Sequence, residues 1–181
     1  MSPESLAEWQ AHLSMEAGAA ATLLGLVFVA ASINLKQIVV TPSLPGRVVE
    51  TVTQFVQVLF ISMVMTIPRQ PGRALSVEIL VVAICSWMIQ MLAFAKYRQA
   101  RLGNPGWWLI VRIVQTHFAT VPFVVAGVWL WLRFEDALYW VIPGFFFSFF
   151  AGLVNSWVLL IKVGRRGQGG RPKDDHPESD A

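Results

Sequence analysis

Apolar residues fall in five long stretches, and the short segments between them are rich in proline and glycine. A bilayer core about 30 Å thick requires roughly 20 apolar residues in a helix that rises 1.5 Å per residue. Each stretch reaches this length, so the pattern predicts an all-α membrane protein with five transmembrane helices. The predicted spans are about residues 17–35, 48–67, 74–95, 107–132 and 139–161.

The second stretch is more polar than the others, with Glu50, Gln54 and Gln57 among its residues. A four-span alternative, in which this segment lies at the membrane interface, therefore stays open. The fourth and fifth stretches are separated by only a few residues around Arg133. This short connection predicts a tight antiparallel hairpin.

Composition supports a membrane protein and excludes several other classes. Of the 181 residues, 55% are hydrophobic and 14% are charged, against roughly 25% charged in soluble domains. Cys85 is the only cysteine, which excludes a disulfide framework. No motif of a nucleophilic, metal-dependent or nucleotide-binding enzyme occurs. We therefore expect no enzyme, no cofactor and no bound metal.

The Lys and Arg residues of the connecting segments predict the orientation of the chain. Cytoplasmic loops of membrane proteins carry an excess of these residues. If the N-terminus lies outside, the outer side holds only Arg69, Arg73 and Arg133. We therefore expect the N-terminus outside and the C-terminus in the cytoplasm, and the basic pI of 9.4 does not indicate nucleic-acid binding. The inner side then holds Lys36, Arg47, Lys96, Arg98, Arg101, Lys162, Arg165 and Arg166.

The two ends of the chain differ from the apolar bundle of residues 14–163. Residues 1–13 place Leu6, Trp9 and Leu13 on one helical face, which predicts a short interfacial helix on the outer surface. Residues 164–181 are polar, glycine-rich and of mixed charge, so we expect a disordered cytoplasmic tail. Near the N-terminus, Glu8, His12 and Glu16 recur every four residues. Such a row drifts by about 40° at each step, so we expect a solvated face here and not a metal site.

Polar residues within the apolar stretches are the candidates for function, because they are costly at bilayer depth. Glu50, Gln54 and Gln57 are spaced i, i+4 and i+7 and form one polar stripe on a helix. Arg112 lies near the inner side, where its side chain can extend to the membrane surface or form a structural ion pair. If it points into the bundle, Glu50 lies at matching depth and is the candidate partner. The stripe either forms hydrogen bonds between helices or lines a water-filled pathway. The pathway-lining candidates are Glu50, Gln54, Gln57, Ser86, Arg112, Thr116, His117 and Asn155.

Pro122 interrupts the fourth stretch close to His117 and is the candidate gating kink. Proline lacks an N–H group, so the carbonyl of Phe118 loses its helical partner. A kinked helix with an imidazole and a free carbonyl at mid-depth suits gating or proton transfer. The alternative for His117 is a hydrogen-bonded packing residue.

Small residues predict helix-packing faces in the first and fifth stretches. In the first stretch these residues are Gly18, Thr22 and Gly25, and in the fifth they are Ser148 and Gly152. Small side chains allow the backbones of transmembrane helices to approach closely. The pattern does not specify which helix packs there.

The first stretch also carries a family resemblance. Residues 18–36 read GAAATLLGLVFVAASINLK, and residues 42–47 read PSLPGR. This segment resembles the opening of an uncharacterised family of small bacterial polytopic integral membrane proteins. The resemblance implies five spans with an uncleaved first helix, located in the bacterial cytoplasmic membrane. It implies no reaction, substrate or partner.

Two functions fit these patterns. The first is a small oligomeric channel or permeation protein for ions or small solutes, with a pathway that the second span lines at a subunit interface. The alternative is a non-enzymatic accessory or structural subunit, or modulator, of a larger membrane complex. The expected partners are the lipid bilayer, further copies of the chain and, for the alternative, another membrane protein.

Overall fold

The computed structural model describes residues 3–41, 44–100 and 107–168, and within them the chain is helical without any strand. Five helices are long, one is short, and a 3-10 helix joins the last two long ones. In chain order the elements are α1 (Pro3–Ile33), α2 (Leu35–Val40), α3 (Leu44–Met65), α4 (Gly72–Ala100), α5 (Trp107–Trp131), η1 (Glu135–Trp140) and α6 (Val141–Gln168).

Each long helix contains a segment that is long and apolar enough to cross a membrane, which confirms the predicted number of spans. The polar second stretch forms α3, a helix of 22 residues, so by length and composition it qualifies as a span and not as an interfacial segment. The five segments fit a multi-pass membrane protein. They are Trp9–Ile33, Leu44–Met65, Gly72–Ala95, Ile110–Trp131 and Asp136–Val158.

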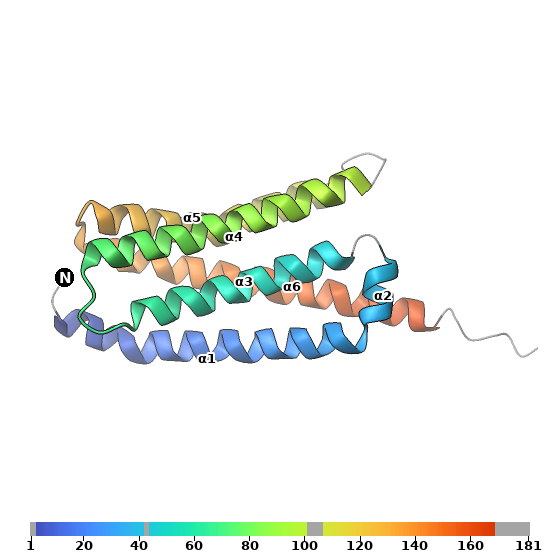
Figure 1. The fold of residues 1–181 in the computed structure, drawn as a ribbon, viewed down its shortest axis with the longest axis horizontal. Helices are drawn as coiled ribbons and strands as arrows, with labels where there is room; N and C mark the ends of the chain where they lie inside the picture. Colours follow the sequence, from blue (N-terminus) through green and yellow to red (C-terminus); the bar gives the residue numbers. More distant parts are fainter. Residues whose placement is uncertain (1–2, 42–43, 101–106, 169–181) are drawn as a thin grey trace, which may run out of the picture.

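Successive long helices run in opposite directions along one elongated bundle (Figure 1). α3 occupies the centre and packs against α1, α4 and α6, while α5 packs against α4 and α6. The end that holds the start of α1 and η1 is called the N-terminal end below. The end that holds α2 is called the C-terminal end.

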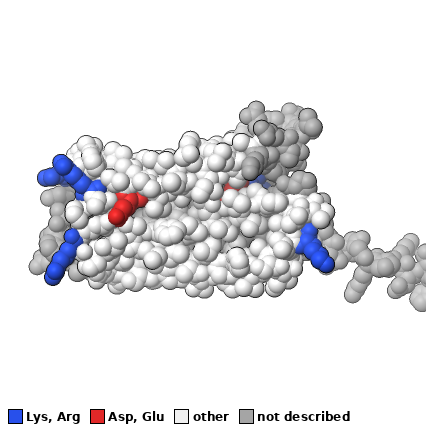
Figure 2. All heavy atoms as spheres, in the orientation of Figure 1, with Lys and Arg blue, Asp and Glu red and all other residues white. Residues whose placement is uncertain are grey.

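Burial differs sharply between the spans. In α3 56% of the span is buried inside the protein, whereas in α1 the share is 11%. In the face drawn in Figure 2, the visible Lys and Arg side chains lie near the two ends, and uncharged residues cover most of the surface between them. An apolar belt between charged ends is the surface that a lipid bilayer requires.

Glycines let the central helices approach closely. A methyl group added at Gly152 of α6 would lie 2.5 Å from Cζ of Phe55 on α3. A methyl group at Gly144 of α6 would lie 2.7 Å from the ring of Phe123 on α5. These two glycines therefore receive aromatic rings from the neighbouring helices, and both rings are fully buried.

The two ends of the chain differ from the sequence predictions. Residues 3–13 do not form a separate helix, because α1 continues without a break from Pro3 to Ile33. Leu13 is fully buried, and the ring of Trp9 lies 5.5 Å from that of Tyr139, so this part of α1 packs on the bundle. The predicted tail also starts too early, because α6 continues to Gln168; residues 169–181 lie outside the described residues.

Candidate functional site

A continuous set of buried polar side chains runs along the inward side of α3, and we call it, with its partners on other helices, the polar column. From Arg47 to Ser62 it extends over fifteen helical rises, or about 22 Å, which is most of the thickness of a bilayer core. All of its α3 members are buried, and Gln57 is completely inaccessible. These members are Arg47, Glu50, Gln54, Gln57 and Ser62.

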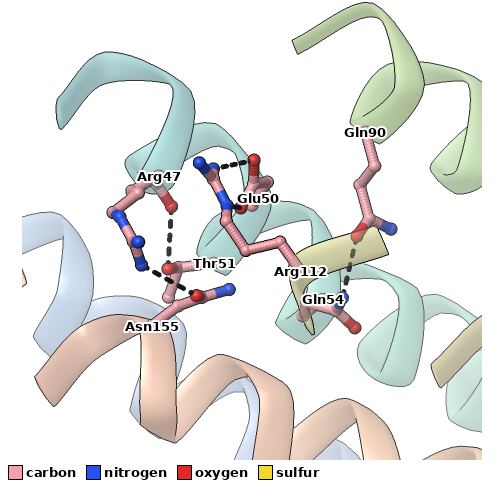
Figure 3. A network of polar contacts seen from close by, with 7 residues as sticks. All are labelled: Arg47, Glu50, Thr51, Gln54, Gln90, Arg112 and Asn155. Atoms are coloured by element: carbon pink, nitrogen blue, oxygen red, sulfur yellow. Dashed lines mark hydrogen bonds and ion pairs between the residues drawn. The ribbon is translucent and has the colours of Figure 1, made fainter. Parts of the chain in front are cut away.

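The ion pair between Glu50 of α3 and Arg112 of α5 lies in the half of the column nearer the C-terminal end (Figure 3). Arg112 Nε donates to Glu50 Oε2 at 3.2 Å, and Arg112 Nη2 donates to Glu50 Oε1. The ring of Phe94 on α4 lies 5.0 Å from the Arg112 guanidinium carbon. A bidentate pair with a stacked ring fixes the position of both charges. Arg112 thus points into the bundle and pairs with the carboxylate at its depth, and its side chain does not extend to the membrane surface.

Arg47 connects α3 with α6 next to this ion pair (Figure 3). Its Nη1 donates to Asn155 Oδ1 at 3.4 Å, while the Thr51 hydroxyl donates to the Arg47 carbonyl at 2.9 Å. The prediction of orientation counts Arg47 among the basic residues of the cytoplasmic surface. In the structure, however, only 7% of the residue is exposed. It starts the polar column at the C-terminal end.

Gln54 connects α3 with α4 one turn further along the column (Figure 3). Its Nε2 donates to Gln90 Oε1 at 2.8 Å, and Gln90 Nε2 donates to the Ser86 carbonyl at 3.3 Å. The sequence reasoning missed Gln90. Its signal was a glutamine within an apolar stretch, four residues after Ser86 and therefore on the same helical face.

Gln57 reaches α5 at the middle of the column. Its Nε2 donates to the Ala119 carbonyl at 3.2 Å, and the Ser148 hydroxyl of α6 donates to the same carbonyl at 3.2 Å. Pro122 lies inside α5 three residues later. The expected acceptor was the carbonyl of Phe118, whereas the donors from other helices reach that of Ala119. Neighbouring helices commonly supply donors in this way where a proline interrupts a transmembrane helix.

Several oxygens of the column are buried without a hydrogen-bond partner in the part of the chain that the structure describes. An unsatisfied buried polar atom costs about 1–3 kcal/mol, and native proteins contain few of them. Gln54 and Gln57 each direct the amide nitrogen to a partner and leave the oxygen unmatched. The column therefore has unused capacity to bind polar groups at mid-depth. The atoms are Gln54 Oε1, Gln57 Oε1, Ser62 Oγ and Thr120 Oγ1.

His117 is the pathway candidate that the structure places away from the column. Its Nδ1 lies 2.7 Å from the Ile113 carbonyl, and its ring meets the edge of Trp87 on α4. The preceding residue, Thr116, points into the bundle and is buried. Successive residues of a helix point about 100° apart, so His117 points away from the column. This geometry corrects the pathway interpretation of His117 and matches the packing alternative.

The two small-residue faces have different surroundings. On α6, Ser148 and Gly152 are buried against neighbouring helices of the same chain. On α1, a methyl group added at Gly18 or Gly25 meets nothing within 4 Å, and the Thr22 hydroxyl donates to its own helix at the Gly18 carbonyl. The face of α1 is therefore open.

In the part of the chain that the structure describes, no three His, Cys, Asp or Glu residues lie close enough together to hold a metal ion. Cys85 is exposed on α4. Comparison with protein-family models, curated proteins and solved structures found no match for this chain.

Proposed function

We propose that this protein is a permeation protein for ions or small polar solutes, with a pathway that follows the polar column through the interior of one bundle. The observation that carries the proposal is the set of unmatched oxygens of Gln54, Gln57, Ser62 and Thr120 along a buried polar face. These oxygens can replace part of the hydration of a passing solute. Because the stripe points into the protomer, we place the pathway there and not at a subunit interface.

Energetics favour this function over a purely structural role for the column. Hydrogen bonds between transmembrane helices contribute only about 0.6 kcal/mol on average. Each unmatched buried oxygen costs more than that, about 1–3 kcal/mol. A buried ion pair adds little stability over apolar residues of similar size. An apolar interface would thus hold these helices together at least as well, so the column needs a reason other than stability.

The ion pair of Glu50 and Arg112 is the proposed gate. Both side chains are at most 5% exposed, so the column is closed at this level. Solute passage requires the two side chains to separate or to exchange partners. Arg47 lies about one helical turn from Glu50, which favours a cluster of charges that selects solutes by sign.

We further propose that the N-terminus lies outside and that the C-terminal end faces the cytoplasm, in the cytoplasmic membrane of a bacterium. The support is the excess of Lys and Arg on that side and the resemblance of residues 18–36. In this orientation, the gate lies towards the cytoplasmic side.

Flux through liposomes reconstituted with the purified protein tests the proposed function. Dyes sensitive to protons, potassium and chloride report transport after a concentration jump. We expect Gln57→Leu to lower the flux about tenfold, since a barrier higher by about 1.4 kcal/mol has this effect. Arg112→Ala should change the flux or its charge selectivity, and the control His117→Leu, outside the column, should not. Absent flux in the wild type, or unchanged flux in both column variants, contradicts the proposal.

The second candidate, an accessory subunit or modulator of a larger membrane complex, is favoured by the open face of α1. A methyl group added at Gly18 or Gly25 would meet nothing within 4 Å, and small-residue faces of this kind accept another helix. A stoichiometric partner recovered in mild detergent supports this candidate. Recovery of a homo-oligomer alone supports the first candidate instead, with α1 at the interface between copies.

A further inference from the structure

A groove between α1 and α6, away from the polar column, is a second candidate binding site. It lies near the N-terminal end and has a volume of about 310 Å³, a size at the lower end of the range for small-molecule sites. One wall consists of apolar side chains of α6, most of them aromatic, and α1 faces this wall with His12 and Glu16. The α6 residues are Ile142, Phe145, Phe146, Phe149, Phe150 and Leu153.

The carboxylate of Glu16 faces the middle of this wall. α1 and α6 run in the same direction (Figure 1), and the ring of His12 lies 6.3 Å from that of Phe145. Glu16 lies about one turn further along α1, so it is roughly level with Phe149, and the wall continues beyond it to Leu153. A ligand in the groove therefore meets apolar side chains on both sides of the charge.

Glu16 has few partners for its charge among the described residues. Its side chain is only 16% exposed, and its one ion-pair partner in the described part of the chain is His12, whose Nε2 lies 3.7 Å from Glu16 Oε1. This distance is longer than a hydrogen bond, and the same Nε2 is buried without a hydrogen-bond partner among the described residues. A buried carboxylate within a membrane span costs free energy unless a cation neutralises it.

The lining of the groove determines which cation fits. Inorganic cations such as Mg²⁺ and Ca²⁺ prefer several oxygen ligands, and a primary ammonium group carries three N–H donors. Apart from apolar side chains, the lining contains one carboxylate and one imidazole. Aromatic rings attract a cation through their negative faces without a hydrogen bond, and quaternary ammonium ligands are recognised in this way. A cation shielded by apolar substituents therefore matches both parts of the site.

The depth of Glu16 favours a free cation over the headgroup of a lipid. The rings of Trp9 and Tyr139 lie 5.5 Å apart at the N-terminal end, and such aromatic residues sit at the level of the headgroups. Glu16 lies about 10 Å further along α1 than Trp9, and thus at the level of the acyl chains. Phe146 and Phe150 are more than half exposed, so the groove opens towards the lipid, from which an apolar cation can enter.

From this geometry we infer that the groove binds a lipophilic organic cation, such as a quaternary ammonium or phosphonium ion with aryl or alkyl substituents. The Glu16 carboxylate supplies the opposite charge, and the phenylalanine wall of α6 contacts the substituents. The ring of His12, which lies 5.9 Å from that of Trp9, continues the aromatic lining on α1. The inference goes beyond the proposed function, because none of these residues belongs to the polar column. Loss of this site and loss of flux along the column are therefore separate outcomes.

Equilibrium dialysis of the full-length protein in mild detergent tests the inference with two probes of similar size and shape. Tetraphenylphosphonium is the cation and tetraphenylborate the matched anion, and binding to empty micelles is subtracted. We expect the wild type to bind the cation saturably and about tenfold more tightly than the anion. Glu16→Gln should weaken cation binding about tenfold and remove the preference. Phe146→Leu, at a position that is 66% exposed, should weaken cation binding about threefold, because leucine is apolar but lacks the ring.

Two variants outside the groove serve as matched controls. Glu78→Gln removes a partly buried carboxylate that accepts a bond from Gln70, and Phe28→Leu removes an exposed ring of α1. Neither should change cation binding.

Three results would overturn the inference. The first is equal binding of cation and anion by the wild type, or a preference that persists in Glu16→Gln. The second is loss of the preference in Glu78→Gln as well, since the effect would then not belong to this groove. The third is displacement of the cation by short-chain phosphatidylcholine, whose headgroup is also a quaternary ammonium, because the site would then bind a lipid.

Discussion

At the residue scale, Glu50 and Arg112 are the clearest case of charges that stability alone does not explain. Both are buried, and they bind each other through two hydrogen bonds. Removing one partner of such a pair leaves a buried charge, whereas replacing both with apolar residues is often neutral. The difference between single and double variants therefore separates stability from function.

We expect Glu50→Leu or Arg112→Met alone to lower the free energy of unfolding by about 3–5 kcal/mol. The double variant should recover most of this loss, because neither charge is then left unpaired. Unfolding in mixed micelles with increasing denaturing detergent measures the free energy of unfolding of each single variant and of the double variant. If the double variant loses as much free energy of unfolding as the two single variants together, Glu50 and Arg112 do not act as a unit.

Gly152 supports a second prediction at this scale, because a side chain there meets the ring of Phe55. Gly152→Ala should destabilise the bundle by about 1–3 kcal/mol through overpacking. The matched control is Gly25→Ala on α1, where nothing lies within 4 Å; it should be neutral or slightly stabilising, since alanine favours a helix over glycine by about 1 kcal/mol. Equal effects at both positions in the same unfolding assay would contradict the packing described for α6.

The sequence predicts which residues belong to the site better than it predicts the directions in which their side chains point. The pairing of Glu50 with Arg112 follows from their matching depths once Arg112 points into the bundle. His117 was placed wrongly, since adjacent residues of a helix differ in direction by about 100° and the sequence does not reveal how α5 is rotated. Gln90 was missed for the same reason, because its role depends on α4 facing α3.

At the element scale, long helices are predictable and short ones are not. A span needs about 20 apolar residues, which gives a strong signal even in the polar α3. α2 has six residues and η1 has six, too few for a periodic pattern. The start of α1 was misjudged because a helix that lies on the membrane and a helix that enters the bundle have the same one-sided pattern.

The open face of α1 allows a test of assembly. Gly18→Leu combined with Gly25→Leu should dissociate an oligomer or complex that uses this face, and the protomer should remain folded because both positions lie outside its core. Light scattering coupled to size-exclusion chromatography measures the mass. Phe28→Leu, an exposed change on the same helix, serves as the control. An unchanged assembly mass in the double glycine variant would exclude this face as the interface.

At the scale of the whole molecule, the distribution of charge predicts one orientation. Lys36 and Arg69 are both exposed and lie near opposite ends of the bundle. In a Cys85→Ser background, a membrane-impermeant maleimide added to intact spheroplasts should label Arg69→Cys and spare Lys36→Cys. The opposite pattern would invert the proposed topology and move the gate to the outer side.

The central claim is that solutes pass through the inside of one bundle along α3. The most direct test combines flux with chemical modification of a single cysteine. In the Cys85→Ser background, Gln57→Cys places a thiol in the column, while Phe60→Cys places one on a surface that is 50% exposed and faces away from the bundle. The thiolate is the reactive form, so modification by a charged methanethiosulfonate requires a watery path to the residue.

We predict that the reagent modifies Gln57→Cys in reconstituted liposomes and stops the flux, and that the flux of Phe60→Cys is unaffected. Mass spectrometry of the same samples reports the extent of modification. Flux that continues after complete modification of Gln57→Cys, or a thiol at this position that never reacts while the protein conducts, would contradict a pathway along the polar column.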